Sequence, residues 1–228
     1  MFDFLFSAES RRRKMLEDAP EGAISEYLSA PLIDRSRDIH AVPLLSLDFE
    51  TSGLDASKDH IVSAGYVAIE DGMIQLSTAR HELVKLGGSL TEQSVVIHKI
   101  TDDDVSAGLP LDEVVGNLLH ALAGKIMVAH HAKIELTFLT QACQKLYGVS
   151  PRFPVIDTMR IAKRWLERRN KEIEQGDLRL FNLRKRYGLP MYQAHNALSD
   201  AIATAELLQA QIGHMDSSQN LPLKQFLS

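Results

Sequence analysis

Hydrophobic and polar positions alternate in three segments of the first half of the chain, as is typical of β-strands. These segments cover residues 44–49, 61–69 and 73–83, and a turn at Gly53 separates the first two. Glu70-Asp71-Gly72 separates the last two, and Asp-Gly is typical of a tight hairpin turn. The pattern therefore predicts an antiparallel meander of three strands.

From about residue 112 onward, apolar residues recur with the period of an amphipathic helix. We predict helices over residues 112–123, 133–147, 158–169, 182–187 and 197–211, with short buried strands at 126–129 and 155–156. A meander followed by alternating helices and strands indicates an α/β domain with a mixed sheet and helices packed on its faces.

The two ends of the chain lack this alternation of strands and helices. Residues up to about 40 are expected to be helical and irregular, with a short amphipathic piece at 24–28, and the chain from Asp216 is expected to be a mobile tail. We therefore divide the chain into an N-terminal extension (1–40), a core domain (41–213) and a C-terminal tail (214–228).

Composition narrows the class of protein. A chain of 228 residues with 45% hydrophobic content can bury one substantial core. Cys143 is the only cysteine and lies in the apolar stripe of a predicted helix, so we expect it to serve packing. The apolar N-terminus is too short for a signal sequence, and no segment approaches the length of a membrane span. We expect a cytoplasmic protein without a membrane partner.

Charge is distributed unevenly along the chain. The net charge is -5, yet residues 157–190 contain ten lysines and arginines against five acids. This segment can attract a polyanion, although a pair of helices simply solvated by basic side chains would have the same composition.

Two acids stand in the first predicted strand, where a buried strand should have none. Asp48 and Glu50 are two positions apart, so they lie on the same face and their carboxylates converge. Such a pair is tolerated when it shares a proton or when divalent cations neutralise it. A strand end turning into solvent is the weaker alternative, because Leu47 and Phe49 require a core.

A third acid and a histidine lie at the start of the last predicted helix. Asp200 falls among alanines and leucines in the early turns, and His195 is five residues upstream, so both side chains can reach one cleft. A histidine beside a metal-bound water is placed to take its proton. The alternatives are an acid favoured by the helix dipole and a surface or capping histidine.

Glu135 is a fourth candidate acid. It follows His130-His131 at the start of the helix over 133–147, where it can point toward Asp48 and Glu50 or can equally be a solvated helix acid. A zinc site at the two histidines is disfavoured, because neighbouring residues point in different directions and no cysteine accompanies them.

Three segments of the chain resemble the three motifs of the DEDDh, or DnaQ-like, 3′-5′ exonucleases. That superfamily includes the polymerase III ε subunit, ribonuclease T and oligoribonuclease. The segments are Leu47-Asp48-Phe49-Glu50-Thr51-Ser52-Gly53-Leu54, Val128-Ala129-His130-His131-Ala132-Lys133-Ile134-Glu135 and His195-Asn196-Ala197-Leu198-Ser199-Asp200-Ala201. Ile97-His98-Lys99-Ile100-Thr101 and Ile156-Asp157-Thr158 are also similar to family segments, so the resemblance covers roughly residues 43–212.

The resemblance implies a ribonuclease H-like fold and a two-metal phosphodiester hydrolysis. It implies that two Mg²⁺ or Mn²⁺ ions are held by four carboxylates and that His195 acts as the general base. The four metal ligands are Asp48, Glu50, Glu135 and Asp200. It further implies that Thr51 contacts the 3′ hydroxyl through its backbone, that Leu54 stacks on the base and that His98 is a weaker nucleotide contact. Asp157 is expected to be a structural acid.

The second motif departs from the family pattern. Glu135 stands where the family has aspartate, Ile134 where it has phenylalanine, and His130-His131 where it has His-Asn. The sequence is therefore compatible with two functions. One is an active exonuclease on single-stranded DNA or short RNA, and the other is a catalytically weakened nucleic-acid-binding or polymerase-associated subunit. A homodimer is one candidate assembly. Gln219-Asn220-Leu221-Pro222-Leu223 faintly resembles a peptide that docks on a sliding clamp.

Overall fold

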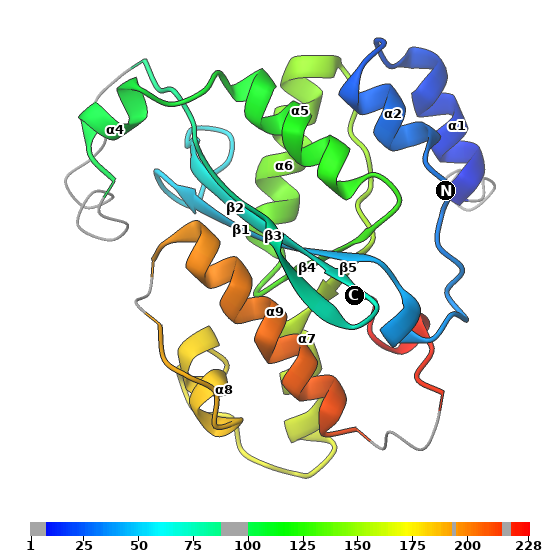
Figure 1. Ribbon diagram of the computed structural model, residues 1–228, viewed down its shortest axis with the longest axis vertical. Coiled ribbons are helices and arrows are strands. Elements are labelled where there is room, and N and C mark those ends of the chain that lie inside the picture. Colours follow the sequence, from blue (N-terminus) through cyan, green and yellow to red (C-terminus); the bar gives the residue numbers. More distant parts are fainter. Residues whose placement is uncertain (1–7, 88–99, 193–194, 216–219) are drawn as a thin grey trace.

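A five-stranded mixed sheet forms the centre of the protein (Figure 1). The computed structural model describes residues 8–87, 100–192, 195–215 and 220–228. The strands lie in the order β3-β2-β1-β4-β5, and β1 pairs antiparallel with β2 and parallel with β4. Their bounds are Leu44–Thr51 for β1, Ile61–Glu70 for β2, Met73–Leu83 for β3, Ile126–Ala129 for β4 and Val155–Asp157 for β5. The predicted meander and mixed sheet are confirmed.

The hairpin between β2 and β3 has the predicted turn. Asp71 and Gly72 both have positive φ angles, 48° and 71°, and Glu70 pairs with Met73 across the turn. Positive φ at both central positions is the geometry that suits the right-handed twist of the two strands. Asp-Gly therefore sets the register of this edge of the sheet.

Helices cover both faces of the sheet (Figure 1). On one face, α5 (Leu111–Leu122) and α6 (Lys133–Tyr147) pack against Leu45, Leu47 and Phe49 of β1. On the other face, α7 (Thr158–Glu167) and α9 (Ala197–Gly213) pack against Leu44, and α8 (Leu180–Arg186) packs beside α9. The short helix α4 spans Asp102–Ser106. No helix in the described ranges is long and apolar enough to cross a membrane.

The predicted N-terminal extension packs on the domain. It contains α1 (Ala8–Asp18), α2 (Ala23–Ser29) and the 3₁₀ turn η1 (Ile39–Ala41). Ile24, Tyr27 and Leu28 join the same hydrophobic core as α5 and α6. Arg12 of α1 donates hydrogen bonds to the carbonyls of Tyr27, Leu28 and Ala30, which fastens α1 to α2. The extension is thus part of the folded core layer above the sheet.

The C-terminal segment corrects our prediction of a mobile tail. Residues 220–228, which include the 3₁₀ turn η2 (Leu223–Gln225), bury Leu221, Leu223 and Phe226 against the face of the sheet that α9 covers. The Leu221 N–H donates to Asp38 at 3.0 Å, and the Ser228 N–H donates to the Val155 carbonyl at 3.0 Å. In the segment that resembles a clamp-docking peptide, the two leucines are therefore buried, while Gln219 lies outside the described residues.

Cys143 confirms the packing role expected for it. Its side chain is fully buried on α6. Burial raises the pKa of the thiol to about 12, because the thiolate would lie in an apolar environment. The thiol is therefore neutral across the physiological pH range.

Candidate active site

Strand β1 carries Asp48 and Glu50 on the face covered by α9. Leu45, Leu47 and Phe49 alternate with them and fill the opposite face. Glu50 is only 8% exposed, although it is the penultimate residue of the strand. The two predicted acids are therefore placed together at the end of a central strand, under a helix.

Two small residues let α9 approach β1 and β2 closely. Gly65 lies opposite Asp48 in the sheet, and a Cβ atom at Gly65 would lie 2.1 Å from the main chain of Ala197 and of Leu198. Ser46 donates a hydrogen bond of 2.7 Å to the Ala201 carbonyl. We did not identify either residue from the sequence, although a glycine inside a strand often marks a close backbone approach.

The start of α9 brings Asp200 and His195 to Glu50. His195 has a φ angle of +66°, and its backbone N–H donates to Asp200 Oδ2 at 3.0 Å. Asn196 caps the helix by accepting the Ser199 N–H. One potential ligand atom from each of Glu50, His195 and Asp200 lies within 4.8 Å of the other two. Three predicted site residues from two distant segments therefore form one cluster.

Asp48 and Glu135 are not members of this group of three among the described residues, but Glu135 is buried near it. Glu135 lies in the first turn of α6 and is only 3% exposed, so it is no solvated helix acid. Burial raises its pKa to about 8, with Asp157 and Glu50 contributing repulsion. The pKa of Asp48 is raised well above its usual range by burial and then by Glu135, Asp200 and Glu50. Each of the other three predicted carboxylates thus raises the pKa of Asp48.

Asp157 holds the beginnings of two helices, as expected of a structural acid. Its carboxylate accepts the backbone N–H groups of His131 at 3.1 Å and Ala132 at 3.2 Å, which precede α6. It also caps α7 by accepting the N–H groups of Met159 and Arg160. These bonds fix the start of α6 and therefore the position of Glu135.

Replacing Asp157 by alanine is expected to destabilise the fold by about 2 kcal/mol, because four N–H groups lose their acceptor. Urea unfolding measures this free energy. Asp157→Asn keeps one carbonyl acceptor and is expected to retain more of the stability. A loss no larger for alanine than for asparagine would contradict the structural role.

His130 is engaged by the protein on both ring nitrogens. Nδ1 lies 2.8 Å from the Thr158 hydroxyl, and Nε2 lies 2.9 Å from the Leu178 carbonyl. Since a carbonyl only accepts, Nε2 must carry the proton and Nδ1 accepts from Thr158. Burial lowers the pKa of His130 to about 4, so the ring is neutral at physiological pH. His130 ties β4 to α7 and the loop before α8.

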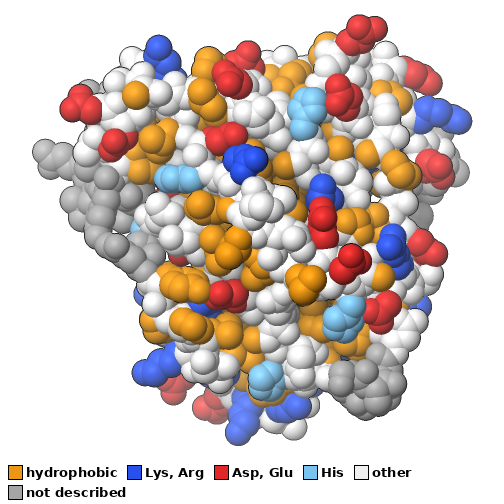
Figure 2. Space-filling model, viewed as in Figure 1, with side chains coloured by type: hydrophobic (Ala, Val, Ile, Leu, Met, Phe, Trp, Pro, Cys, Tyr) orange, Lys and Arg blue, Asp and Glu red, His pale blue; other side chains and the backbone are white. Residues whose placement is uncertain are grey.

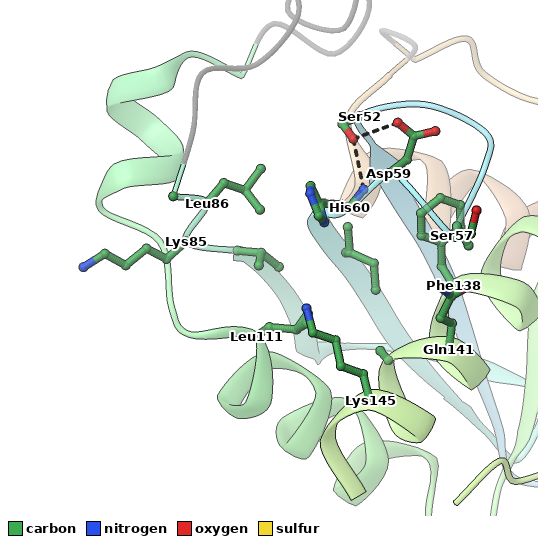
Figure 3. Close-up of a pocket in the computed structure, with 15 residues that line it drawn as sticks. Ser52, Ser57, Asp59, His60, Lys85, Leu86, Leu111, Phe138, Gln141 and Lys145 are labelled. Carbon is green, nitrogen blue, oxygen red and sulfur yellow. Dashed lines mark hydrogen bonds between the residues drawn. The ribbon is translucent and has the colours of Figure 1, made fainter. Parts of the chain in front are cut away.

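The turn after β1 holds the predicted substrate contacts. Thr51 donates its hydroxyl to the Gly53 carbonyl at 2.7 Å, and the Leu54 side chain is 81% exposed. Ser52 and Asp59 fasten the turn, and a cavity of about 790 Å³ opens beside it toward α6, with Lys145 extending into it (Figure 3). The predicted contact His98 lies outside the described residues.

A family model matches most of the chain. The model RNase_T, described as an exonuclease, matches residues 45–208, which include all four carboxylates and His195. The chain belongs to the RNase_T exonuclease family. The family that the motifs predicted, that of the DnaQ-like 3′-5′ exonucleases, is confirmed.

Curated relatives of this exonuclease are much longer proteins. DNA polymerase III PolC-type of Thermotoga petrophila is 33% identical over 161 residues, which are 71% of this chain and 11% of the relative. The same type of protein from Staphylococcus haemolyticus is 28% identical over 92% of this chain and 14% of its own length. The chain thus spans little more than a tenth of these relatives.

Solved structures share the exonuclease fold. The nuclease domain of 3′hExo, a DEDDh family member bound to rAMP, has a TM-score of 0.65 at 13% identity, covering 78% of this chain and 95% of that one. Exonuclease X in complex with 5′ overhanging duplex DNA has a TM-score of 0.59 at 24% identity, covering 80% of this chain and 98% of that one. The zinc-bound E. coli ExoI–ssDNA complex has a TM-score of 0.66 at 15% identity, covering 77% of this chain and 41% of that one. These similarities confirm the predicted ribonuclease H-like architecture.

The acids of this exonuclease fit divalent cations, which DEDDh enzymes generally use. Glu135 Oε2 and Asp200 Oδ1 are buried without a hydrogen-bond partner among the described residues. Burial followed by repulsion from Asp200 raises the pKa of Glu50 to about 7. Oxygen-rich, mutually repelling carboxylates of this kind are the donor set that Mg²⁺ and Mn²⁺ prefer.

In the metal-free protein, stability is expected to fall as the pH rises from about 5 to 8. The folded-state pKa values of Glu50 (about 7) and Glu135 (about 8) exceed ordinary carboxyl values, so the folded state retains protons that the unfolded chain has released. The loss is on the order of 3 kcal/mol for Glu50 alone. Thermal melts in EDTA measure it, and Mn²⁺ is expected to reverse it. Stability that rises with pH across this window would contradict the clustering.

Proposed function

We propose that this chain is a metal-dependent exonuclease that releases nucleoside monophosphates from the 3′ end of single-stranded DNA or short RNA. The observation that carries the proposal is the group formed by Glu50, His195 and Asp200, in which one potential ligand atom of each lies within 4.8 Å of the other two. Asp48 lies on the same strand, and the charges of Glu50, Glu135 and Asp200 raise its pKa. A module that only binds nucleic acid needs basic and aromatic surfaces and has no use for four clustered acids.

Asp48, Glu50, Glu135 and Asp200 would hold two divalent cations, Mg²⁺ or Mn²⁺. Bound cations of this kind activate water and neutralise the charge that develops on the phosphoryl group and the leaving oxygen. Glu135 is one methylene longer than the aspartate of the family motif. Because Mg²⁺ demands near-ideal octahedral geometry, we expect better activity with the more tolerant Mn²⁺.

His195 would take the proton from the attacking water. Its ring is exposed to solvent, while its backbone N–H is fixed by Asp200, so the imidazole is held at the mouth of the cluster. Thr51 would bind the 3′ hydroxyl through its backbone. The exposed Leu54 would stack on the terminal base, and His98 would make a weaker nucleotide contact.

The test is incubation with 3′-labelled and 5′-labelled single-stranded DNA and RNA oligonucleotides in Mg²⁺, Mn²⁺ or EDTA, beside an Asp48→Ala control. We expect stepwise, metal-dependent shortening from the 3′ end that is absent in the control. Binding of the strands without cleavage in either metal would favour the alternative, a weakened nucleic-acid-binding subunit.

Besides binding nucleic-acid 3′ ends, we propose that the protein associates with a DNA polymerase. It is supported by the PolC-type relatives, in which the matching region is a small part of a polymerase. Co-purification with a polymerase, compared with the oligomeric state of the isolated chain, separates this assembly from a homodimer. The 3′-5′ exonuclease proposal does not depend on which assembly forms.

A further inference from the structure

Three arginines form a ridge along α7 and its C-cap residue, Arg168. Arg160, Arg164 and Arg168 are four residues apart, so they lie on one side of the helix at intervals of about 6 Å. The buried side of α7 carries Ile161, Ala162 and Leu166, and the ridge is on the outer side. Arg160 and Arg168 are exposed, and Arg164 is partly exposed. We call these three residues the arginine ridge.

The ridge is not neutralised by acids, unlike two of the basic residues near it. Lys163 pairs with Glu167 at 3.8 Å, and Arg186 pairs with Asp177 at 3.7 Å. Across the described ranges, none of the ridge arginines has a carboxylate within ion-pair distance. Burial lowers the pKa of Arg164, and Arg160 and Arg168 lower it further by repulsion, with Asp157 opposing them. The surface thus keeps three crowded cations that do not serve ion pairing.

The ridge begins close to the catalytic acids. Asp157 caps α7 and accepts N–H groups from the residues that open α6, and its charge contributes to the raised pKa of Glu135. Arg160 is therefore one helical turn from the edge of the cluster. Helix side chains lean toward the N-terminus, so the ridge arginines lean toward this end.

The placement of Arg160 is unfavourable for helix stability. A cation in the first turn opposes the helix dipole, and a sequence selected for stability alone would favour an acid there. A polyanionic substrate, in contrast, is repelled by the four acids and gains from cations placed beside them. Lys and Arg side chains also gather at the lower end of the molecule, where α7 and α8 end (Figure 2).

We propose that the arginine ridge binds consecutive phosphates of the nucleic-acid strand upstream of its 3′ end, guiding the strand along α7. This inference rests on the proposed exonuclease function. Arginine suits the role because its planar guanidinium binds phosphate oxygens in a bidentate manner. The spacing of about 6 Å is of the order of the phosphate repeat in an extended single strand.

The test compares R160Q/R164Q/R168Q with R13Q/K14Q/R35Q. The control removes the same charge from exposed residues of α1 and the following segment, and Lys14 and Arg35 lie beside the starts of β4 and β5. In an Asp48→Ala background, which leaves the strand uncut, the affinity for a single-stranded dodecanucleotide is measured between about 50 and 200 mM salt. A plot of log K against the logarithm of the salt concentration has a negative slope, to which each phosphate contact contributes about 0.7. The magnitude of this slope is expected to be smaller by about 2 in the ridge variant than in the protein with the intact ridge. The control is expected to leave the slope unchanged.

Kinetics separate this proposal from the exonuclease proposal. In the active enzyme, the ridge variant is expected to lower kcat/KM at least tenfold on the dodecanucleotide and less than twofold on a dinucleotide. Equal losses on both substrates, or a control that changes the slope as much, would overturn the ridge while leaving the exonuclease intact. Single variants such as Arg168→Gln, each expected to change the slope by about 0.7, keep the test valid if the triple variant misfolds.

Discussion

Replacing Asp48 by alanine is expected to lower the rate of 3′-end cleavage by about 10³-fold or more. Its carboxylate is on the same strand as Glu50, and its pKa is raised by the charges of Glu135, Asp200 and Glu50, so we expect it to be a metal ligand. Metal ions contribute several kcal/mol to phosphoryl transfer, and each 1.4 kcal/mol is about tenfold in rate. Single-turnover cleavage of a labelled strand at saturating metal measures the loss.

Glu135→Ala is expected to reduce the rate far less than Asp48→Ala. Glu135 has the longer side chain and departs from the family's aspartate, so its contribution to a strict coordination geometry should be smaller. Asp103→Ala removes an exposed acid from α4 and is the control for non-specific effects of losing a negative charge. Equal losses for Asp48→Ala and Glu135→Ala would reject this ranking.

Arg184→Met is expected to destabilise the protein by about 3 kcal/mol, because it removes a fully buried arginine that pairs with the largely buried Glu206 and donates to two carbonyls. The Arg184 side chain is fully buried on α8, and its guanidinium lies 2.7 Å from Glu206 of α9. It also donates to the carbonyls of Ala203 and Pro190, and it lies over the Tyr192 ring. Urea unfolding measures the change.

Arg186→Met is the matched control on the same helix. Arg186 pairs with Asp177 at 3.7 Å, and both side chains are substantially exposed, so its replacement is expected to cost less than about 0.5 kcal/mol. Arg184 also holds the chain at Pro190 and Tyr192, shortly before His195. We therefore expect Arg184→Met to slow cleavage even well below its melting temperature. Similar unfolding free energies for both variants would contradict this account.

The strands and main helices were predictable because their hydrophobic periods are strong. β3, β4 and α6 have the predicted bounds, and the Asp71-Gly72 turn has the expected positive φ angles. The candidate site was predictable for a different reason: carboxylates in an apolar strand or helix are costly to bury, so Asp48, Glu50 and Asp200 stood out. Their roles as metal ligands stay predictions.

What the sequence could not reveal depends on contacts between distant segments. Gly65 and Ser46 set the distance between α9 and β1, yet neither has an unusual local sequence. Arg184 looked like one of ten solvated cations until the fold buried it against Glu206. Leu223 and Phe226 are too few to show a local period, so only the assembled face of the sheet reveals that they pack.

The buried Cys143 makes this chain a convenient subject for thiol chemistry. Because the thiol is inaccessible and protonated in the native state, a thiol reagent can modify it only when α6 separates from the core. The rate of native-state labelling would then report how often the layer above the sheet opens. A cysteine introduced at exposed Leu54 would meanwhile accept a fluorophore in the turn after β1 without background from the native thiol.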